Sequence, residues 1–166
     1  MLAKGNVLTE KPEVRLKRML EGSALAPLAL AESCTGGLIA ARVTSVAGSS
    51  GYFDRGFVVY SNRAKVQLLG VPVKLLETHG AVSRETALAM LDGLFANSPA
   101  GIGAAVTGIA GPDGGTAEKP VGTVWIAWGT RNRRHAELLT LSGDRDAIRE
   151  EAATAVLERL CGVASE

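Results

Sequence analysis

One stretch restricts the possible folds more than any other: an apolar run at residues 28–30 leads directly into a turn-forming sequence at residues 31–37. A proline precedes the run, and residues 38–46 after the turn have the apolar spacing of a helix. This order predicts a strand, a sharp turn with Ser33 at its corner, and a helix. Such a turn places a hydroxyl at a sheet edge and directs the first free N–H groups of the helix toward the same space.

Two interpretations of this turn are open. In the first, Ser33 is a nucleophile, and Thr35, Gly36 and Gly37 contribute to substrate binding, with backbone N–H groups stabilising an oxyanion. In the second, Ser33 or Thr35 only caps the following helix, and the two glycines only permit close packing. The other motifs of the chain have to decide between these interpretations.

The composition favours a layered α/β protein. A chain of 166 residues matches a single domain, expected here to span residues 1–166. Hydrophobic residues make up 46% of the chain but aromatic residues only 4%, so the core must consist mainly of Ala, Val, Leu and Ile. Few aromatic side chains are therefore available to stack on the bases of a nucleic acid.

Charge, cysteine and histidine usage argue against several functions. The formal charge is +1, and the longest basic cluster, residues 131–134, is expected at a solvated hairpin tip, so no nucleic-acid partner is predicted. Cys34 and Cys161 show no paired spacing, which indicates neither a disulfide framework nor a metal knuckle. His79 and His135 lack a nearby cluster of Cys or carboxylates, and we expect no metal and no cofactor.

No membrane association is expected either. Residues 1–5 lead into a polar stretch in place of the apolar core of a signal peptide. Residues 24–31 are apolar, but this segment is too short and is broken by proline. We therefore expect a cytoplasmic protein.

Periodicity predicts the elements that complete the domain. Helices are expected at residues 11–21, 38–46, 62–66 and 73–78, after the cap Ser83 up to residue 97, and from the cap Asp144 to about Gly162. Strands are expected at residues 28–30, 57–60, 101–107, 121–128 and 134–141. The last two strands are expected to pair antiparallel, which makes the sheet mixed. The turn-rich loop at residues 47–51 is a candidate wall of the substrate site.

A second motif follows the strand at residues 57–60. Ser61 is the expected N-cap of the next helix, which places Lys65 in its first turn. A lysine there is usually a solvated surface residue. The positive end of the helix dipole and partial burial would, however, favour its neutral form. A neutral lysine can remove a serine proton where histidine is absent, so Lys65 is the candidate base, and Tyr60 is a candidate helper unless it only packs.

A third motif follows the strand at residues 101–107. Its candidate substrate-binding residues are Thr107, Gly108, Gly111, Gly114 and Gly115. Glycines let the backbone approach a ligand and leave N–H groups free to bind an anionic group such as phosphate. The alternative is a flexible hairpin connection, which the length of the loop and its proline disfavour. All three motifs are expected to meet at one sheet edge.

At these residues the chain resembles the CinA C-terminal domain family, whose characterised activity is that of a nicotinamide-nucleotide amidohydrolase (the PncC type). The resemblance rests on residues 31–37, 60–65, 107–115 and 119–124. It implies an α/β fold, namely a three-layer α/β/α sandwich with a mixed, mostly parallel central sheet. It also implies deamidation of nicotinamide mononucleotide to nicotinate mononucleotide and ammonia without a metal. By the same resemblance Ser33 occupies the position of the nucleophile, and Lys65 and Tyr60 those of the base and its helper.

We therefore expect a Ser–Lys amidohydrolase that acts on a small-molecule nucleotide and forms a homo-oligomer. One alternative is a non-catalytic nucleotide-binding or assembly module, in which the glycine-rich turns bind phosphate and Ser33 only caps a helix. Another is a hydrolase of a different small amide, because the sequence does not define the pocket that would hold the base of the nucleotide.

Overall fold

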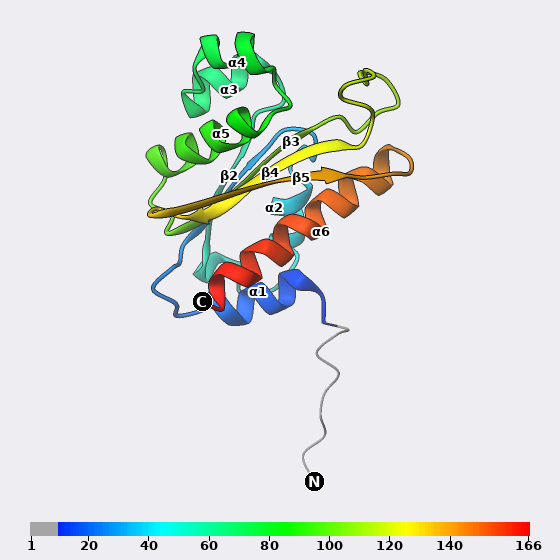
Figure 1. Ribbon diagram of the computed structural model, residues 1–166. Coiled ribbons are helices and arrows are strands. Elements are labelled where there is room, and N and C mark those ends of the chain that lie inside the picture. The colour runs from blue at the N-terminus through cyan, green and yellow to red at the C-terminus, as the bar shows by residue number, and fades with distance from the viewer. Residues whose placement is uncertain (1–9) are drawn as a thin grey trace.

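The computed structural model describes residues 10–166, in which five strands form one sheet between two layers of helices (Figure 1). The strands are β1 (Leu28–Glu32), β2 (Phe53–Val58), β3 (Ile102–Gly108), β4 (Thr123–Thr130) and β5 (Arg133–Thr140). The helices are α1 (Pro12–Leu20), α2 (Leu38–Thr44), the 3-10 turn η2 (Ser49–Gly51), α3 (Asn62–Leu69), α4 (Val73–His79), α5 (Arg84–Ala96) and α6 (Arg145–Ala164). The order of these helices and strands along the chain confirms the elements predicted from periodicity. The prediction for residues 1–5 lies outside the described residues.

The sheet is mixed, as predicted. Its strand order is β2-β1-β3-β4-β5. β1 pairs in parallel with both β2 and β3, whereas β3, β4 and β5 pair antiparallel. Since β1, β2 and β3 run in the same direction, their carboxyl ends lie at one edge, where α/β proteins commonly bind ligands. The segments that follow these three strands carry the three motifs.

Each face of the sheet is covered by helices, which gives the predicted three layers. Leu16, Ile39 and Val156 represent the core between the sheet and helices α1, α2 and α6. Met90 and Leu94 represent the opposite core, which α3, α4 and α5 cover. Figure 1 shows α3, α4 and α5 on one side of the sheet and α1 and α6 on the other. The central strands β1 and β3 are buried on both faces, so their small apolar residues fit between the layers.

The predicted helix starts are confirmed by their capping bonds. Ser61 accepts a hydrogen bond from the Ala64 N–H (3.0 Å) at the start of α3. Ser83 and Asp144 accept the equivalent bonds at the starts of α5 and α6 (3.1 and 2.9 Å). These caps fix where each helix begins, so Lys65 lies in the first turn of α3 as predicted.

The loop at residues 47–51 does not form a wall of the site, so that prediction is wrong. Helix α2 runs back across the sheet, and the loop connects its end to the start of β2. The loop therefore lies at the amino edge of the parallel strands, opposite the three motifs. A Cβ at Gly48 would lie 3.2 Å from the Lys17 ammonium on α1, which is consistent with this position.

Two further features bear on possible partners. Arg131, Arg133 and Arg134 at the β4–β5 turn each donate a hydrogen bond to an oxygen atom of the protein itself. The guanidinium of Arg134 also lies 4.5 Å from the centre of the Phe95 ring. Among residues 10–166, no helix has both the length and the apolar character needed to cross a membrane.

Candidate active site

Glu32, the last residue of β1, organises the turn that contains Ser33. Its side chain is buried, with 1% exposed. The carboxylate accepts hydrogen bonds from Thr35 Oγ1 (2.6 Å) and from the N–H groups of Gly37 (3.0 Å), Ile39 (3.1 Å) and Ala40 (2.8 Å). A negative charge thus satisfies the free N–H groups at the start of α2. The interpretation that Ser33 or Thr35 caps α2 is therefore wrong, because Glu32 provides the acceptor.

Replacement of Glu32 by alanine is expected to lower the free energy of unfolding by about 2–4 kcal/mol, because several buried donors lose their acceptor. Urea denaturation of the two proteins measures the difference. Glu151→Ala is a matched control, because Glu151 is exposed on α6 and its removal is expected to change stability by less than about 0.5 kcal/mol. Equal losses in the two variants would contradict this role of Glu32.

The two glycines of the turn serve its backbone conformation. Gly36 and Gly37 have φ values of 60° and 98°, which favour glycine. A Cβ on either would meet its nearest neighbours only at ordinary contact distances of 3.8 and 3.5 Å, so close packing does not explain them. Their N–H groups bond inside the turn, to the Ser33 carbonyl (3.0 Å) and to Glu32. Among the described residues, the N–H groups of Cys34 and Thr35 have no acceptor.

Lys65 lies beside Ser33 at the carboxyl edge of the sheet. The Nζ atom of Lys65 is 2.9 Å from Ser33 Oγ. The same Nζ also donates to the backbone carbonyls of Val59 (3.1 Å) and Tyr60 (3.3 Å). Only 2% of Lys65 and 7% of Ser33 are exposed. The structure thus brings the candidate nucleophile and the candidate base into hydrogen-bonding contact.

The surroundings of Lys65 favour its neutral form. Burial lowers the pKa of Lys65, because the ammonium loses its hydration. Within residues 10–166 no carboxylate forms an ion pair with it. A neutral amine has two N–H groups and one lone pair, and two of its three neighbours are carbonyls that can only accept. If both N–H groups bond to these carbonyls, the lone pair faces the Ser33 hydroxyl.

Tyr60 contributes its backbone more directly than its side chain. Its carbonyl lies near both Lys65 Nζ and Ser33 Oγ, at 3.3 and 3.4 Å. Its side chain is 58% exposed, and the phenol oxygen accepts a hydrogen bond from Arg145 (2.8 Å). The phenol thus extends toward α6, where its hydroxyl contacts Arg145.

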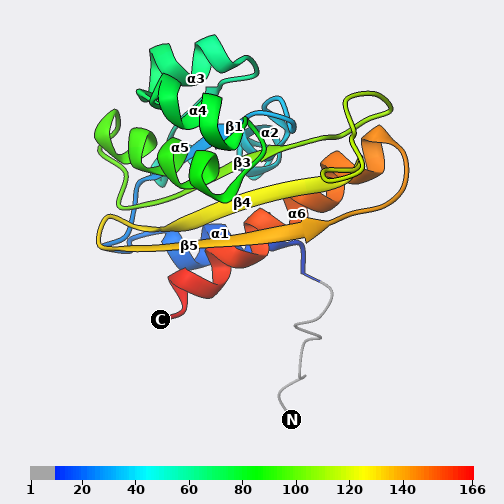
Figure 2. The same cartoon turned by 45° about the horizontal axis from the view of Figure 1, so that its top comes forward.

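Arg145, the first residue of α6, was missed by sequence reasoning. Its second N–H group donates to the Gly111 carbonyl (2.6 Å), which connects the glycine-rich loop to α6. Figure 2 shows this loop beside the start of α6. The predicted cap Asp144 located the helix start, but a contact between residues 85 positions apart leaves no local pattern in the sequence.

A cavity of about 170 Å³ lies over Ser33 and Lys65. Its lining consists of Ser33, Cys34, Tyr60, Asn62, Lys65, Ala81, Val82, Thr107, Gly108, Ala110 and Arg145. Five predicted site residues are therefore brought together: Ser33, Tyr60, Lys65, Thr107 and Gly108. Six others do not line this cavity: Thr35, Gly36, Gly37, Gly111, Gly114 and Gly115.

The glycine-rich loop and Thr107 have different positions relative to the cavity. Thr107 is buried, and its hydroxyl donates to the Ala81 carbonyl (2.8 Å), so its oxygen remains available as an acceptor. Gly114 and Gly115 are exposed beyond the cavity. The distal glycines therefore shape the loop, while the strand end faces the cavity.

Cys34 is a neighbour of Ser33 that also lines the cavity. Burial raises the pKa of the Cys34 thiol to about 11, so the thiol is neutral at physiological pH. A neutral thiol is a weak nucleophile, which argues against Cys34 as the nucleophile. In the part of the chain that the structure describes, no three His, Cys, Asp or Glu side chains gather into a possible metal site.

Comparisons with known proteins agree with this architecture. The family model of the CinA C-terminal domain matches residues 10–163. The crystal structure of the competence/damage inducible protein CihA from Agrobacterium tumefaciens superposes with a TM-score of 0.87 at 42% sequence identity. The match covers 95% of this chain and 98% of that one.

Relatives differ in length. Nicotinamide-nucleotide amidohydrolase PncC from Pseudomonas putida is 48% identical over 141 residues, which are 85% of this chain and 88% of that protein. A CinA-like protein from Geotalea daltonii is 54% identical over 135 residues, or 81% of this chain. The match covers only 33% of the Geotalea protein, so the chain spans about a third of such longer relatives.

Proposed function

The chain belongs to the CinA C-terminal domain family, and we propose that it is an amidohydrolase that converts nicotinamide mononucleotide to nicotinate mononucleotide and ammonia. The observation that carries this proposal is the 2.9 Å contact between Lys65 Nζ and Ser33 Oγ in a buried site. The relative from Pseudomonas putida, named a nicotinamide-nucleotide amidohydrolase, supports the choice of substrate.

In the first half of the proposed reaction, Ser33 attacks the carboxamide carbon. Neutral Lys65 accepts the hydroxyl proton as the bond between Oγ and carbon forms. The carbonyl oxygen of the amide becomes an oxyanion. The resulting ammonium of Lys65 then gives its proton to the amide nitrogen, the C–N bond breaks, and ammonia leaves. An ester of Ser33 with the nicotinate nucleotide remains.

In the second half, water hydrolyses this ester. Lys65, neutral again, accepts a proton from the water molecule that attacks the ester carbonyl. The bond between carbon and Ser33 Oγ breaks, and Lys65 returns the proton to Oγ. The products are nicotinate mononucleotide and the free hydroxyl of Ser33.

The turn after β1 offers donors for the oxyanion. The N–H groups of Cys34 and Thr35 have no acceptor among the described residues, whereas Glu32 occupies those of Gly37 and its neighbours. Cys34 directly follows the nucleophile and lines the cavity, so its N–H is the first candidate to stabilise the oxyanion. Glu32 thus bonds to the amides of Gly37, Ile39 and Ala40, whereas the two amides directly after Ser33 stay unbonded.

Thr107 suits the nitrogen of a carboxamide. Because its proton bonds to the Ala81 carbonyl, Thr107 Oγ1 presents an acceptor to the cavity. An acceptor pairs with the N–H groups of an amide and repels the carboxylate of the product. This arrangement would favour binding of the amide and release of the acid.

Ammonia release from purified protein tests the proposed function. Nicotinamide mononucleotide is expected to give one ammonia per nicotinate mononucleotide formed, and free nicotinamide is expected to react far more slowly because it lacks the ribose and phosphate contacts. Binding of the nucleotide without ammonia release would support the non-catalytic module instead. Release from an unrelated small amide but not from the nucleotide would support a different hydrolase.

The pH dependence of kcat/KM should follow the protonation of Lys65. Lys65 must be neutral before it accepts a proton, so kcat/KM is expected to rise with pH as Lys65 in the free protein deprotonates. Because burial lowers the pKa of Lys65, the midpoint should lie below the ordinary lysine value of about 10.4. A pH–rate profile measures it. A profile that falls as pH rises through neutrality would contradict a lysine base.

A further inference from the structure

A second cavity, of about 430 Å³, lies directly beside the catalytic one. Its lining consists of His79, Val82, Ser83, Arg84, Glu85, Lys119 and Trp125, and we name it the basic groove. Val82 lines both cavities. Trp125 on β4 pairs directly with Thr107 on β3, so their side chains lie on the same face of the sheet. The basic groove therefore continues the catalytic cavity.

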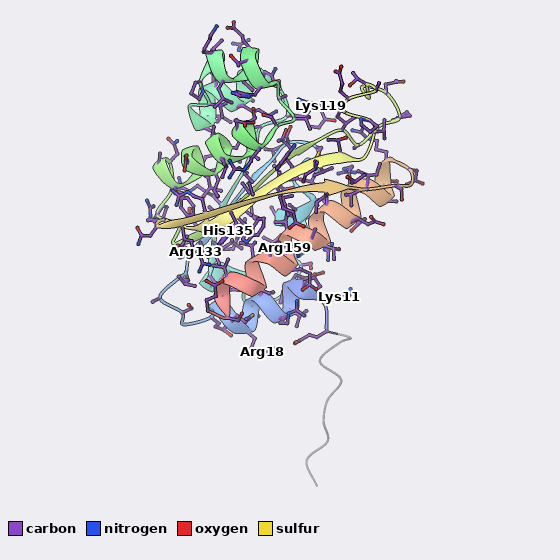
Figure 3. All side chains as sticks on the ribbon, in the orientation of Figure 1. Lys11, Arg18, Lys119, Arg133, His135 and Arg159 are labelled. Atoms are coloured by element: carbon purple, nitrogen blue, oxygen red, sulfur yellow. The ribbon has the colours of Figure 1, made fainter. Side chains whose placement is uncertain are left out.

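The basic groove contains two cations without a carboxylate partner among the described residues. Lys119 is half-buried, and its Nζ donates to the His79 carbonyl (3.1 Å), which leaves two of its three donors free. Figure 3 shows Lys119 between the loop that follows β3 and the helices α4 and α5. Arg84 is exposed at the start of α5, and its guanidinium forms no hydrogen bond or ion pair within residues 10–166.

The groove also contains one carboxylate, that of Glu85. His79 Nδ1 lies 3.6 Å from the Glu85 carboxylate. Glu85 contributes one negative charge to the groove, against the two positive charges of Lys119 and Arg84. The two unpaired cations give the basic groove a positive charge that suits an anionic group.

The catalytic cavity is too small to enclose a whole nucleotide. Its volume of about 170 Å³ lies below the ~300 Å³ typical of sites that enclose a drug-sized ligand. A nucleotide with its carboxamide at Ser33 must therefore extend beyond the cavity. Arg145 also lines the cavity, and because only two of its five N–H donors bond to Gly111 and Tyr60, it is the competing candidate for the phosphate.

We propose that the basic groove is the phosphate subsite of the substrate. With the carboxamide at Ser33, the phosphate extends past Val82 and accepts charge-assisted hydrogen bonds from Lys119 and Arg84. This inference rests on the proposed function and adds to it the residues that distinguish a nucleotide from its riboside.

Selectivity for the phosphate tests the subsite. Lys119→Ala and Arg84→Ala are each expected to lower kcat/KM for nicotinamide mononucleotide by about tenfold to a hundredfold. The kcat/KM for nicotinamide riboside, which lacks the phosphate, should remain unchanged. Lys74→Ala is the matched control, because this exposed lysine of α4 lines neither cavity. Equal losses for both substrates, or a loss of selectivity confined to Arg145→Ala, would overturn the proposal.

A binding measurement separates this inference from the proposed function. Calorimetry can measure the binding of ribose 5-phosphate and of ribose, and neither measurement depends on catalysis. The wild-type protein is expected to bind ribose 5-phosphate more tightly than ribose, and this preference should be lost in the Lys119→Ala, Arg84→Ala double variant. If the wild-type protein releases no ammonia, the proposed function fails. The preference for ribose 5-phosphate over ribose then still tests whether the basic groove binds a phosphate. A double variant that keeps the full preference overturns it.

Discussion

Replacement of Ser33 by alanine is expected to lower ammonia release from nicotinamide mononucleotide by at least a factor of about a thousand, or about 4 kcal/mol of transition-state stabilisation. The reason is that Ser33 Oγ would form the bond to the carboxamide carbon, and within residues 10–166 no other hydroxyl forms a hydrogen bond with Lys65 Nζ. Steady-state ammonia release by the two purified proteins measures the effect.

The Ser33→Ala protein should keep its fold and its ability to bind the nucleotide. Ser33 caps no helix, because Glu32 saturates the start of α2. Ser45→Ala is a suitable control, since Ser45 is exposed at the other end of α2 and should leave turnover unchanged. Turnover by Ser33→Ala at the wild-type rate would exclude Ser33 as the nucleophile.

Loss of the base should have an effect of similar size. Lys65→Met keeps an unbranched apolar side chain but removes the amine, and ammonia release is expected to fall by at least about a thousandfold. Lys65→Arg retains N–H donors but stays charged, so it should be equally inactive. Turnover and nucleotide binding, measured side by side, distinguish a lost base from a lost site. An active Lys65→Arg protein would contradict proton transfer to Lys65.

The two residues should act as a unit. The Ser33→Ala, Lys65→Met double variant is expected to be no slower than the slower of the two single variants, because either change already removes the nucleophile–base pair. Losses that multiply in the double variant would show that the two side chains contribute to independent steps.

The sequence was sufficient to predict that the three motifs meet. Apolar strand-like runs that alternate with helix-forming segments favour parallel strands, and the carboxyl ends of parallel strands share one edge. Capping residues such as Ser61 are local signals, so the place of Lys65 in the first turn of α3 followed from its spacing. The same topology could have corrected the prediction for the loop at residues 47–51. A segment that leads into a parallel strand lies at the amino edge of the sheet, opposite the three motifs.

Long-range contacts could not be predicted in this way. Glu32 resembles any polar residue at a strand end until the backbone folds α2 over it. The contact between Arg145 and Tyr60 joins residues 85 positions apart. The burial of Lys65 likewise depends on elements on either side, whereas spacing alone indicated only its place in the helix. Tertiary packing, which leaves no local pattern, determines all three.

The protonation of Lys65 is the most direct test of a Ser–Lys mechanism. Selective ¹³C labelling of lysine, with the Lys65 signal assigned by comparison with Lys65→Arg, lets NMR follow its titration in the free protein. Because burial lowers the pKa of Lys65, its signal should titrate well below the signals of exposed lysines such as Lys74. Titration together with the exposed lysines, near the ordinary value of about 10.4, would contradict Lys65 as the base that activates Ser33.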